Sequence, residues 1–273
     1  MKLWLLGLLA GALALSSAAT FAATTDIDDT PGAPTAADMA EPPSDGASPL
    51  TGRVLLVSSA ADIVLRPHEV ILTFDDGPKP GTTDSIVKTL NAYGVKATFL
   101  MVGSMALRHP DIVRSVFLSG NTVGTHTFDH QDLSKLDPDA ALDDIQRGED
   151  AVRKALAPIG AEPSPFFRFP YLAQTKVLRA DLTLSGRIAL GAQLDSDDYF
   201  TSTPDRLLRR ILKGLDRTGS GIILMHDIHA RTAKMLPDLL QELEARGYTV
   251  VQLVYRDAPF LGVPLRTATN GTR

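Results

Sequence analysis

The stretch Val70–Pro78, VILTFDDGP, joins an apolar run to two adjacent carboxylates and a Gly-Pro turn. An apolar run of this length that ends in turn residues predicts a buried β-strand. Side chains alternate between the two faces of a strand, so Asp75 and Asp76 start on opposite sides of the backbone. One carboxylate can therefore bind a metal while the other faces a substrate.

The same order, a short apolar run and then a longer amphipathic segment, continues along the chain. Glycine, proline and capping residues delimit the amphipathic segments as helices. Strand–helix alternation with short turns predicts an α/β fold with a parallel sheet. Strands are predicted at 70–74, 97–102, 122–125, 166–168, 188–193, 222–225 and 249–253, and helices at 82–93, 104–119, 138–157, 176–185, 204–215 and 233–245.

Side chains that could take part in catalysis or metal binding follow the first, third, fourth, fifth and sixth of these strands, each time at the C-terminal end. In a β/α barrel all of these ends meet at one rim, whereas a doubly wound open sheet brings together mainly the loops at its switch point. About seven strand–helix units also suit a barrel. We therefore predict a single-domain, deformed (β/α)7–8 barrel.

The segment HTFDH at 126–130 places two imidazoles four residues apart, directly after a predicted strand. This spacing puts two rings on one side of a helical turn, although such a pair often arises by accident. A carboxylate and two imidazoles form a three-ligand set for a divalent metal and leave one position open for water. Asp129 and Asp132 are candidates to orient the rings. The set predicts hydrolysis by metal-activated water.

Three further clusters stand at strand ends. FRFPY at 167–171 places Arg168 beside a proline-stiffened turn, LDSDDY at 194–199 is rich in acids, and IILMHD at 222–227 ends an apolar strand with His226. Taken singly, each cluster has a simpler explanation: Arg168 could form a surface ion pair, 194–199 could be an acidic loop, and His226 could be a capping histidine.

In this order the five clusters resemble the polysaccharide deacetylases of the NodB-homology type, carbohydrate esterase family 4. The resemblance extends from about Glu69 to Leu253 and is most specific in TFDDGP at 73–78 and HTxxH at 126–130. It implies a deformed (β/α) barrel that hydrolyses acetyl groups of sugars, most often N-acetyl groups. The chain departs from the family pattern at Tyr199, where relatives commonly carry Trp, and at Leu172, where Gly often follows the Pro-Tyr pair.

The resemblance also implies a metal centre and a base. Asp76, His126 and His130 match the metal ligands of the family. Asp75 matches the general base, and Arg168 matches the cation that holds and tunes it. Zinc is the first expectation for the metal, with cobalt, nickel or manganese as alternatives, because affinity order alone does not decide occupancy.

The remaining roles concern the leaving group and the acetyl pocket. His226 matches the general acid, oriented by Asp198. The backbone N–H of Tyr171 would stabilise the oxyanion together with the metal. Leu224 and Tyr199 would line the pocket for the acetyl methyl, and Tyr199 would keep an aromatic face where the family has Trp.

The N-terminal part has a different composition. Residues 1–23 combine a basic start, a short apolar core and a small-residue exit, which predicts a secretory signal peptide, or else an uncleaved anchor. Residues 24–50 hold five prolines and six acids and predict a disordered linker, with the deacetylase domain at 66–260. Cysteine is absent, which fits a bacterial envelope better than a eukaryotic secretory route.

The balance of basic and acidic residues limits the classes of molecule that the folded part could bind. Lys2 is the only basic residue before Arg53, so 26 basic residues balance 26 acids in the folded part. A nucleic-acid binder needs a basic footprint, and this class is therefore excluded. No protein partner is implied, and we expect a monomer.

We expect an exported, metal-dependent deacetylase, periplasmic or secreted, that acts on an N-acetylated glycan such as peptidoglycan or a chitin-like oligosaccharide. One alternative is an O-acetyl polysaccharide esterase of the xylan type on the same site. Another is a catalytically inactive glycan-binding protein of the envelope.

Overall fold

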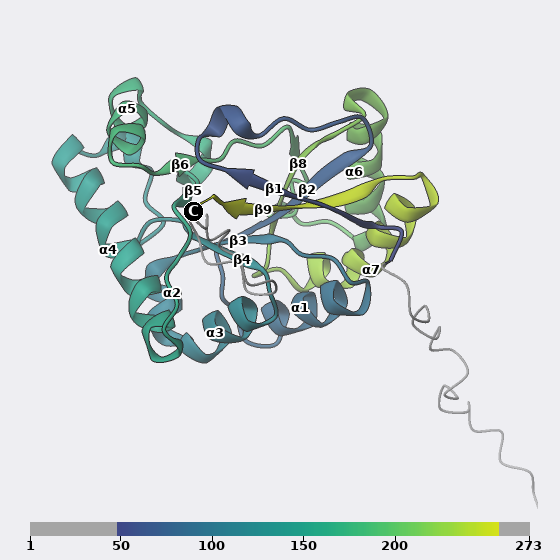
Figure 1. Cartoon of the computed structure of the whole chain (residues 1–273), viewed down its shortest axis with the longest axis horizontal. Coiled ribbons are helices and arrows are strands. Elements are labelled where there is room, and N and C mark those ends of the chain that lie inside the picture. Colours follow the sequence, from purple (N-terminus) through teal and green to yellow (C-terminus); the bar gives the residue numbers. More distant parts are fainter. Residues whose placement is uncertain (1–47, 257–273) are drawn as a thin grey trace, which may run out of the picture. The chain divides into compact units, whose positions relative to one another are not determined.

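The computed structural model describes residues 48–256 (Figure 1). The predicted signal peptide, the linker up to residue 47 and residues 257–260 of the predicted domain lie outside the described residues. Among the described residues, no helix has both the length and the apolar character that a membrane span requires. The strands are β1 Thr51–Val57, β2 Glu69–Asp75, β3 Thr98–Met101, β4 Thr122–Thr125, β5 Phe166–Phe167, β6 Ile188–Ala189, β7 Leu194–Asp195, β8 Gly221–His226 and β9 Thr249–Tyr255. The helices are α1 Thr82–Ala92, α2 Gly103–Arg108, α3 Pro110–Leu118, α4 Pro138–Leu156, α5 Lys176–Leu184, α6 Pro204–Thr218 and α7 Ala230–Ala245, with short 3-10 turns such as η4 Pro170–Leu172.

Parallel strands form a ring, as predicted for a deformed barrel. Ladders run continuously from β6 through β5, β4, β3 and β2 to β8 and β7. Within the described residues no ladder joins β7 to β6; instead residues 190–193 carry the chain from one to the other. The ring is therefore closed at this point by the covalent chain. Figure 1 shows the helices around the outside of the strands.

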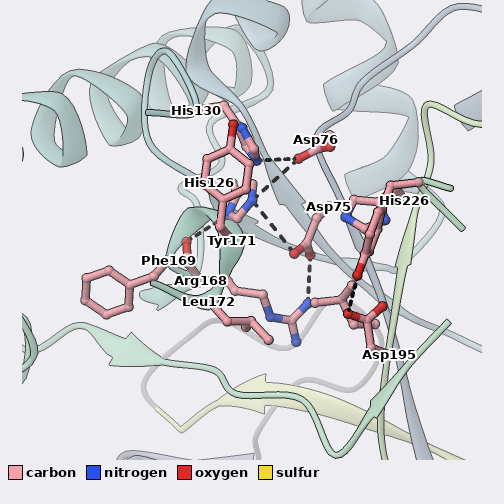
Figure 2. Close-up of a pocket in the computed structure, with 12 residues that line it drawn as sticks. Asp75, Asp76, His126, His130, Arg168, Phe169, Tyr171, Leu172, Asp195 and His226 are labelled. Carbon is pink, nitrogen blue, oxygen red and sulfur yellow. Dashed lines mark hydrogen bonds and ion pairs between the residues drawn. The ribbon is translucent and has the colours of Figure 1, made fainter. Parts of the chain in front are cut away.

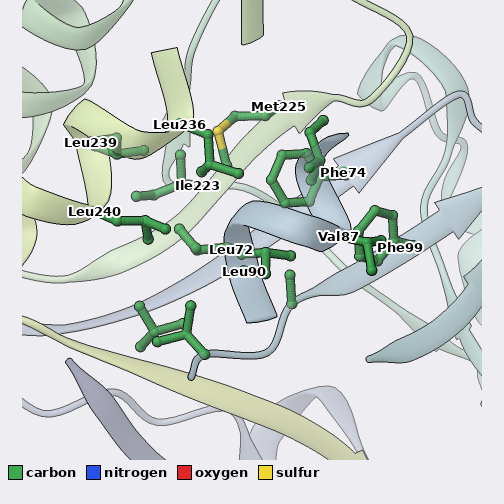
Figure 3. Close-up of a cluster of buried hydrophobic side chains, with 14 of the residues drawn as sticks. Leu72, Phe74, Val87, Leu90, Phe99, Ile223, Met225, Leu236, Leu239 and Leu240 are labelled. Carbon is green, nitrogen blue, oxygen red and sulfur yellow. The ribbon is translucent and has the colours of Figure 1, made fainter. Parts of the chain in front are cut away.

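The two faces of each strand bury different side chains. On β2, Leu72 and Phe74 pack outward against helices such as α1 and α7, as Figure 3 shows, whereas Ile71 belongs to a separate interior cluster. Period-two alternation then directs Thr73 and Asp75 to the interior as well. The ring thus places the last residue of β2 at the C-terminal mouth of the barrel.

Strand β1 was not predicted and belongs to the same sheet. It pairs with β9, and β9 pairs with the start of β2. Leu55 and Val57 of β1 join the interior cluster, and Leu50, within the predicted linker, is fully buried in the outer one. The folded structure therefore includes residues before the predicted domain start at residue 66.

Two predicted elements are divided in the structure. The predicted helix 104–119 is two helices, α2 and α3, because Pro110 occupies the first position of a new helix and His109 between them is not helical. The predicted strand 188–193 is only β6, and β7 follows after a non-ladder segment. The predicted helix start at Pro138 is confirmed, with Asp137 as its cap.

Removal of β1 should abolish cooperative unfolding. A chain that begins at residue 66 loses Leu55 and Val57 from the interior cluster and one partner strand of β9. Burial of each such side chain stabilises by about 1.5–3 kcal/mol, a large part of a typical 5–15 kcal/mol. Thermal unfolding followed by circular dichroism, with a chain that begins at residue 48 as control, tests this. Equal transitions in the two chains would contradict it.

Candidate functional site

A cavity of about 300 Å³ opens at the C-terminal ends of the strands (Figure 2). It brings together the predicted site residues from β2, the loop after β4, the segment after β5, the loop after β7 and β8. Asp195 and Leu172 also line the cavity, although their sequence context predicted no role for either. The complete lining is Asp75, Asp76, His126, His130, Arg168, Phe169, Tyr171, Leu172, Asp195, Tyr199, Leu224 and His226, with Asp198 behind His226.

Two imidazole nitrogens converge on one carboxylate oxygen. His130 Nε2 lies 3.1 Å and His126 Nε2 lies 3.5 Å from Asp76 Oδ1. The three donor atoms all lie within 4.8 Å of one another. Asp76 Oδ1 is buried and has no hydrogen-bond partner among the described residues. A buried acceptor without a partner is rare and costly, and a cation bound at this point would satisfy it.

The ionisation of this cluster suits cation binding. Burial alone would raise the pKa of Asp76, but the nearby imidazoles of His130 and His126 lower it to about 2. Burial lowers the pKa of His126, which favours the neutral form of the ring. His126 Nδ1 lies 2.7 Å from the carbonyl oxygen of Arg168, which can only accept, so Nδ1 carries the proton. The lone pair of Nε2 is thereby directed toward Asp76.

The predicted helical turn at 126–130 is wrong. These residues form a loop in which Thr127 and His130 have φ values of 64° and 56°. The amide of His130 donates to Thr127 Oγ1 at 2.9 Å and fixes the loop. The rings still meet, with centroids 4.9 Å apart. The positive φ of both residues, rather than helical spacing, brings the imidazoles together.

The residues proposed to orient the rings also differ. Asp132 caps the turn at Ser134, and Asp129 lies 3.6 Å from Arg147. The carbonyl of Arg168 takes the orienting role for His126. The loop also packs closely on α4, since a Cβ on Gly148 would lie 2.4 Å from the backbone of Thr127. A glycine inside a helix was a signal for such a close approach.

Arg168 and Asp75 form a buried ion pair inside the barrel mouth. Arg168 Nη1 donates to Asp75 Oδ1 and to Thr73 Oγ1, each at 2.8 Å. Nη2 donates to the carbonyl of Gly191 at 2.9 Å. Both charged side chains are essentially inaccessible to solvent. The pair leaves Asp75 Oδ2 without a contact to Arg168, 3.9 Å from His126 Nε2.

His226 and Asp198 form a second pair on the other side of Asp75 (Figure 2 shows His226). His226 Nδ1 lies 2.5 Å from Asp198 Oδ1, while Thr232 Oγ1 and the His226 amide donate to Asp198 Oδ2. Burial would lower the pKa of His226, but the hydrogen bond and the charge of Asp198 raise it to about 9. The ring is therefore protonated at neutral pH. Its Nδ1 contacts Asp198, and its other nitrogen, Nε2, does not.

Asp198, His226 and His229 also offer donor atoms within 4.8 Å of one another. Two features disfavour a cation there. Asp198 and His226 already satisfy each other, and an Arg231 guanidinium nitrogen lies 3.4 Å from His229 Nδ1. The Asp76 cluster is the better metal site.

Aromatic and aliphatic side chains complete the cavity. The Tyr171 ring packs edge-on against His130, and the Tyr199 ring packs edge-on against His226. The Tyr199 hydroxyl lies 3.2 Å from Asp195 Oδ2 and 3.1 Å from Asp197 Oδ1, which fixes the ring. Leu224 is buried on the inward face of β8.

Comparison with known proteins identifies the family. The sequence profile of polysaccharide deacetylases matches residues 64–187. A chitin deacetylase of Colletotrichum lindemuthianum is 30% identical over 76% of this chain and 87% of its own. The chain belongs to the polysaccharide deacetylase family.

Two further relatives of this deacetylase-family chain are bacterial. The peptidoglycan-N-acetylglucosamine deacetylase PgdA of Listeria monocytogenes is 32% identical over 67% of this chain, which spans only 38% of that relative's length. A solved peptidoglycan deacetylase of Bdellovibrio bacteriovorus superposes with a TM-score of 0.66 at 32% identity, over 78% of this chain and 58% of its own. The barrel fold is therefore shared with this family.

Asp198→Asn should lower the pKa of His226 from its value of about 9, because burial remains while the charge of the Asp198 carboxylate is lost. NMR titration of the imidazole in metal-free protein measures this. Since the folded value lies above the unfolded one, the pair stabilises the wild type fully below pH 6.5 and loses this effect as pH rises through 9. Asp197→Asn is the control, because this half-buried carboxylate contacts Tyr199 and Arg210 rather than His226. Equal shifts in both variants would contradict the assignment.

Proposed function

We propose that this chain is a metal-dependent deacetylase that hydrolyses N-acetyl groups of a glycan, either peptidoglycan or a chitin-like oligosaccharide. The observation that carries the proposal is the buried Asp76 Oδ1, without a hydrogen-bond partner in the described structure and facing the Nε2 atoms of His126 and His130. A carboxylate and a protonated imidazole stand beside it. The activities named for the relatives support the same substrate class.

Asp76, His126 and His130 would hold a divalent cation. Nitrogen and oxygen donors with an open position suit zinc first, and cobalt, nickel or manganese as alternatives. When bound, the cation would polarise the acetyl carbonyl and lower the pKa of a water molecule toward neutrality, so that a nearby carboxylate can take its proton.

Asp75 is the base in this proposal. Arg168 occupies its Oδ1, so Oδ2 is the atom that takes the proton from the attacking water. The buried guanidinium pairs with the carboxylate and fixes its position. The backbone N–H of Tyr171 is assigned to the negative charge that develops on the acetyl oxygen.

His226 is the acid. Its Nε2–H can protonate the sugar nitrogen as the C–N bond breaks, and Asp198 stabilises the imidazolium until then. An amine leaves only when it is protonated, whereas the oxygen of a sugar ester needs this help less. The raised pKa of His226, to about 9, therefore favours an amide substrate over the O-acetyl esterase alternative. Asp75 and His226 together also argue against an inactive binding protein.

Export is proposed together with this activity. Peptidoglycan lies outside the cytoplasmic membrane, so a signal peptide at 1–23 would bring the enzyme to its substrate.

Acetate release from defined N-acetylglucosamine oligomers and from acetylated xylan, each with and without a chelator, tests the proposal. We expect release from the N-acetylated glycan only, abolished by the chelator and restored by zinc.

His126→Ala should also lose bound metal in elemental analysis, whereas His229→Ala should retain it. Release from xylan alone would contradict the amide assignment, and unchanged metal in His126→Ala would contradict the ligand set.

His226→Ala should slow amide hydrolysis by about 10²–10⁴-fold, the usual effect of a positioned acid. An activated phenyl acetate, whose leaving group needs no proton, should lose far less. The ratio of the two kcat/KM values is the measurement. Equal losses on both substrates would argue against the acid role.

A further inference from the structure

Leu172 lies beside the proposed catalytic residues in a backbone conformation that leucine rarely takes. It has φ 55°, and Tyr171 before it has φ 58°. A Cβ disfavours this left-handed region by roughly 5- to 30-fold in population, and glycine has no such penalty. Two consecutive residues of this kind mark a turn that the surrounding structure enforces.

The fold does not need the Leu172 side chain. The turn is held by backbone bonds, from Leu172 N to the Phe169 carbonyl and from Ala173 N to the Pro170 carbonyl, each 3.0 Å. Glycine at 172 would keep both. The leucine side chain is 39% exposed and belongs to none of the buried hydrophobic clusters of the described residues. Stability therefore gives no reason for a leucine at this position.

The position of the side chain does give a reason. Leu172 lines the same cavity as Asp75 and His226, and Figure 2 shows it on the Arg168 side, away from His130. The other aliphatic side chain of the lining is Leu224, which is 4% exposed, and the Tyr199 ring is fixed nearby. The apolar surface of the cavity thus has a buried part, which includes Leu224 and Phe169, and a more exposed rim to which Leu172 belongs.

We propose that Leu172 determines the size of the acyl group that the site accepts, an inference that rests on the proposed deacetylase function. The acyl carbon must lie near Asp75 and the metal ligands, and the leaving nitrogen near His226. The acyl methyl is then left with the apolar part of the cavity. Leu172 closes the rim of that part, so an acetyl group fits and a longer chain meets the leucine side chain.

The test compares hydrolysis of N-acetyl, N-propionyl and N-butyryl chitotetraose by the wild type, Leu172→Ala and Leu172→Gly. One methylene in a fitted pocket changes kcat/KM by roughly 10- to 200-fold. We expect the wild type to favour acetyl, and both variants to raise the propionyl-to-acetyl ratio by about 10-fold or more. Val177→Ala, which removes an exposed aliphatic group outside the cavity lining, is the control and should leave the ratio at the wild-type value.

Thermal unfolding separates the backbone from the side chain. Leu172→Ala keeps a Cβ in the left-handed region and Leu172→Gly does not, so the glycine variant should unfold roughly 2–4 °C above the alanine variant. Equal unfolding temperatures would overturn the backbone argument.

An unchanged acyl profile, or an equal loss on all three substrates, would overturn the inference, since the latter indicates contact with the sugar instead. A wild type inactive on all three substrates would overturn the deacetylase function itself, and the inference with it.

Discussion

The buried guanidinium of Arg168 organises the whole site. The guanidinium donates to the carboxylate of Asp75 and to the hydroxyl of Thr73 on β2. The backbone carbonyl of Arg168 faces His126 Nδ1. One residue thereby fixes the proposed base and the tautomer of a proposed metal ligand. Removal of either partner of a buried ion pair typically costs 3–5 kcal/mol, because the remaining charge stays buried. The site and the stability of the barrel mouth therefore depend on the same contact.

Three titratable side chains of the site, two carboxylates and one imidazole, have different partners and therefore different proposed roles. Asp75 is paired with the Arg168 guanidinium, Asp76 faces two imidazoles, and His226 is paired with Asp198. Asp75 and His226, the proposed base and acid, end neighbouring strands and both line the cavity, as amide hydrolysis would require of such a pair. Burial would otherwise neutralise such groups, so each one depends on a specific partner.

The sequence predicted the barrel because hydrophobic alternation and strand-end chemistry are local signals. Each predicted site residue lies around one cavity or directly behind it, since parallel strands bring their C-terminal ends together. Strand β1 was missed because its partner, β9, lies nearly the whole domain away in sequence, and no local pattern reports such a pairing. The break at Pro110 was readable from its proline, whereas the left-handed residues of the 126–130 loop were not, because neither is a glycine.

The missing ladder between β6 and β7 leaves backbone oxygens free to bind the Arg168 guanidinium. A regular barrel would engage the backbone oxygens of residues 190 and 191 in a ladder with a neighbouring strand. Here these oxygens instead accept from Arg168, at 3.4 Å from Nε and 2.9 Å from Nη2. The gap in the hydrogen-bonded ring thus provides the acceptors that hold the guanidinium. A more symmetrical relative of this fold would have to solvate the same charge by other means.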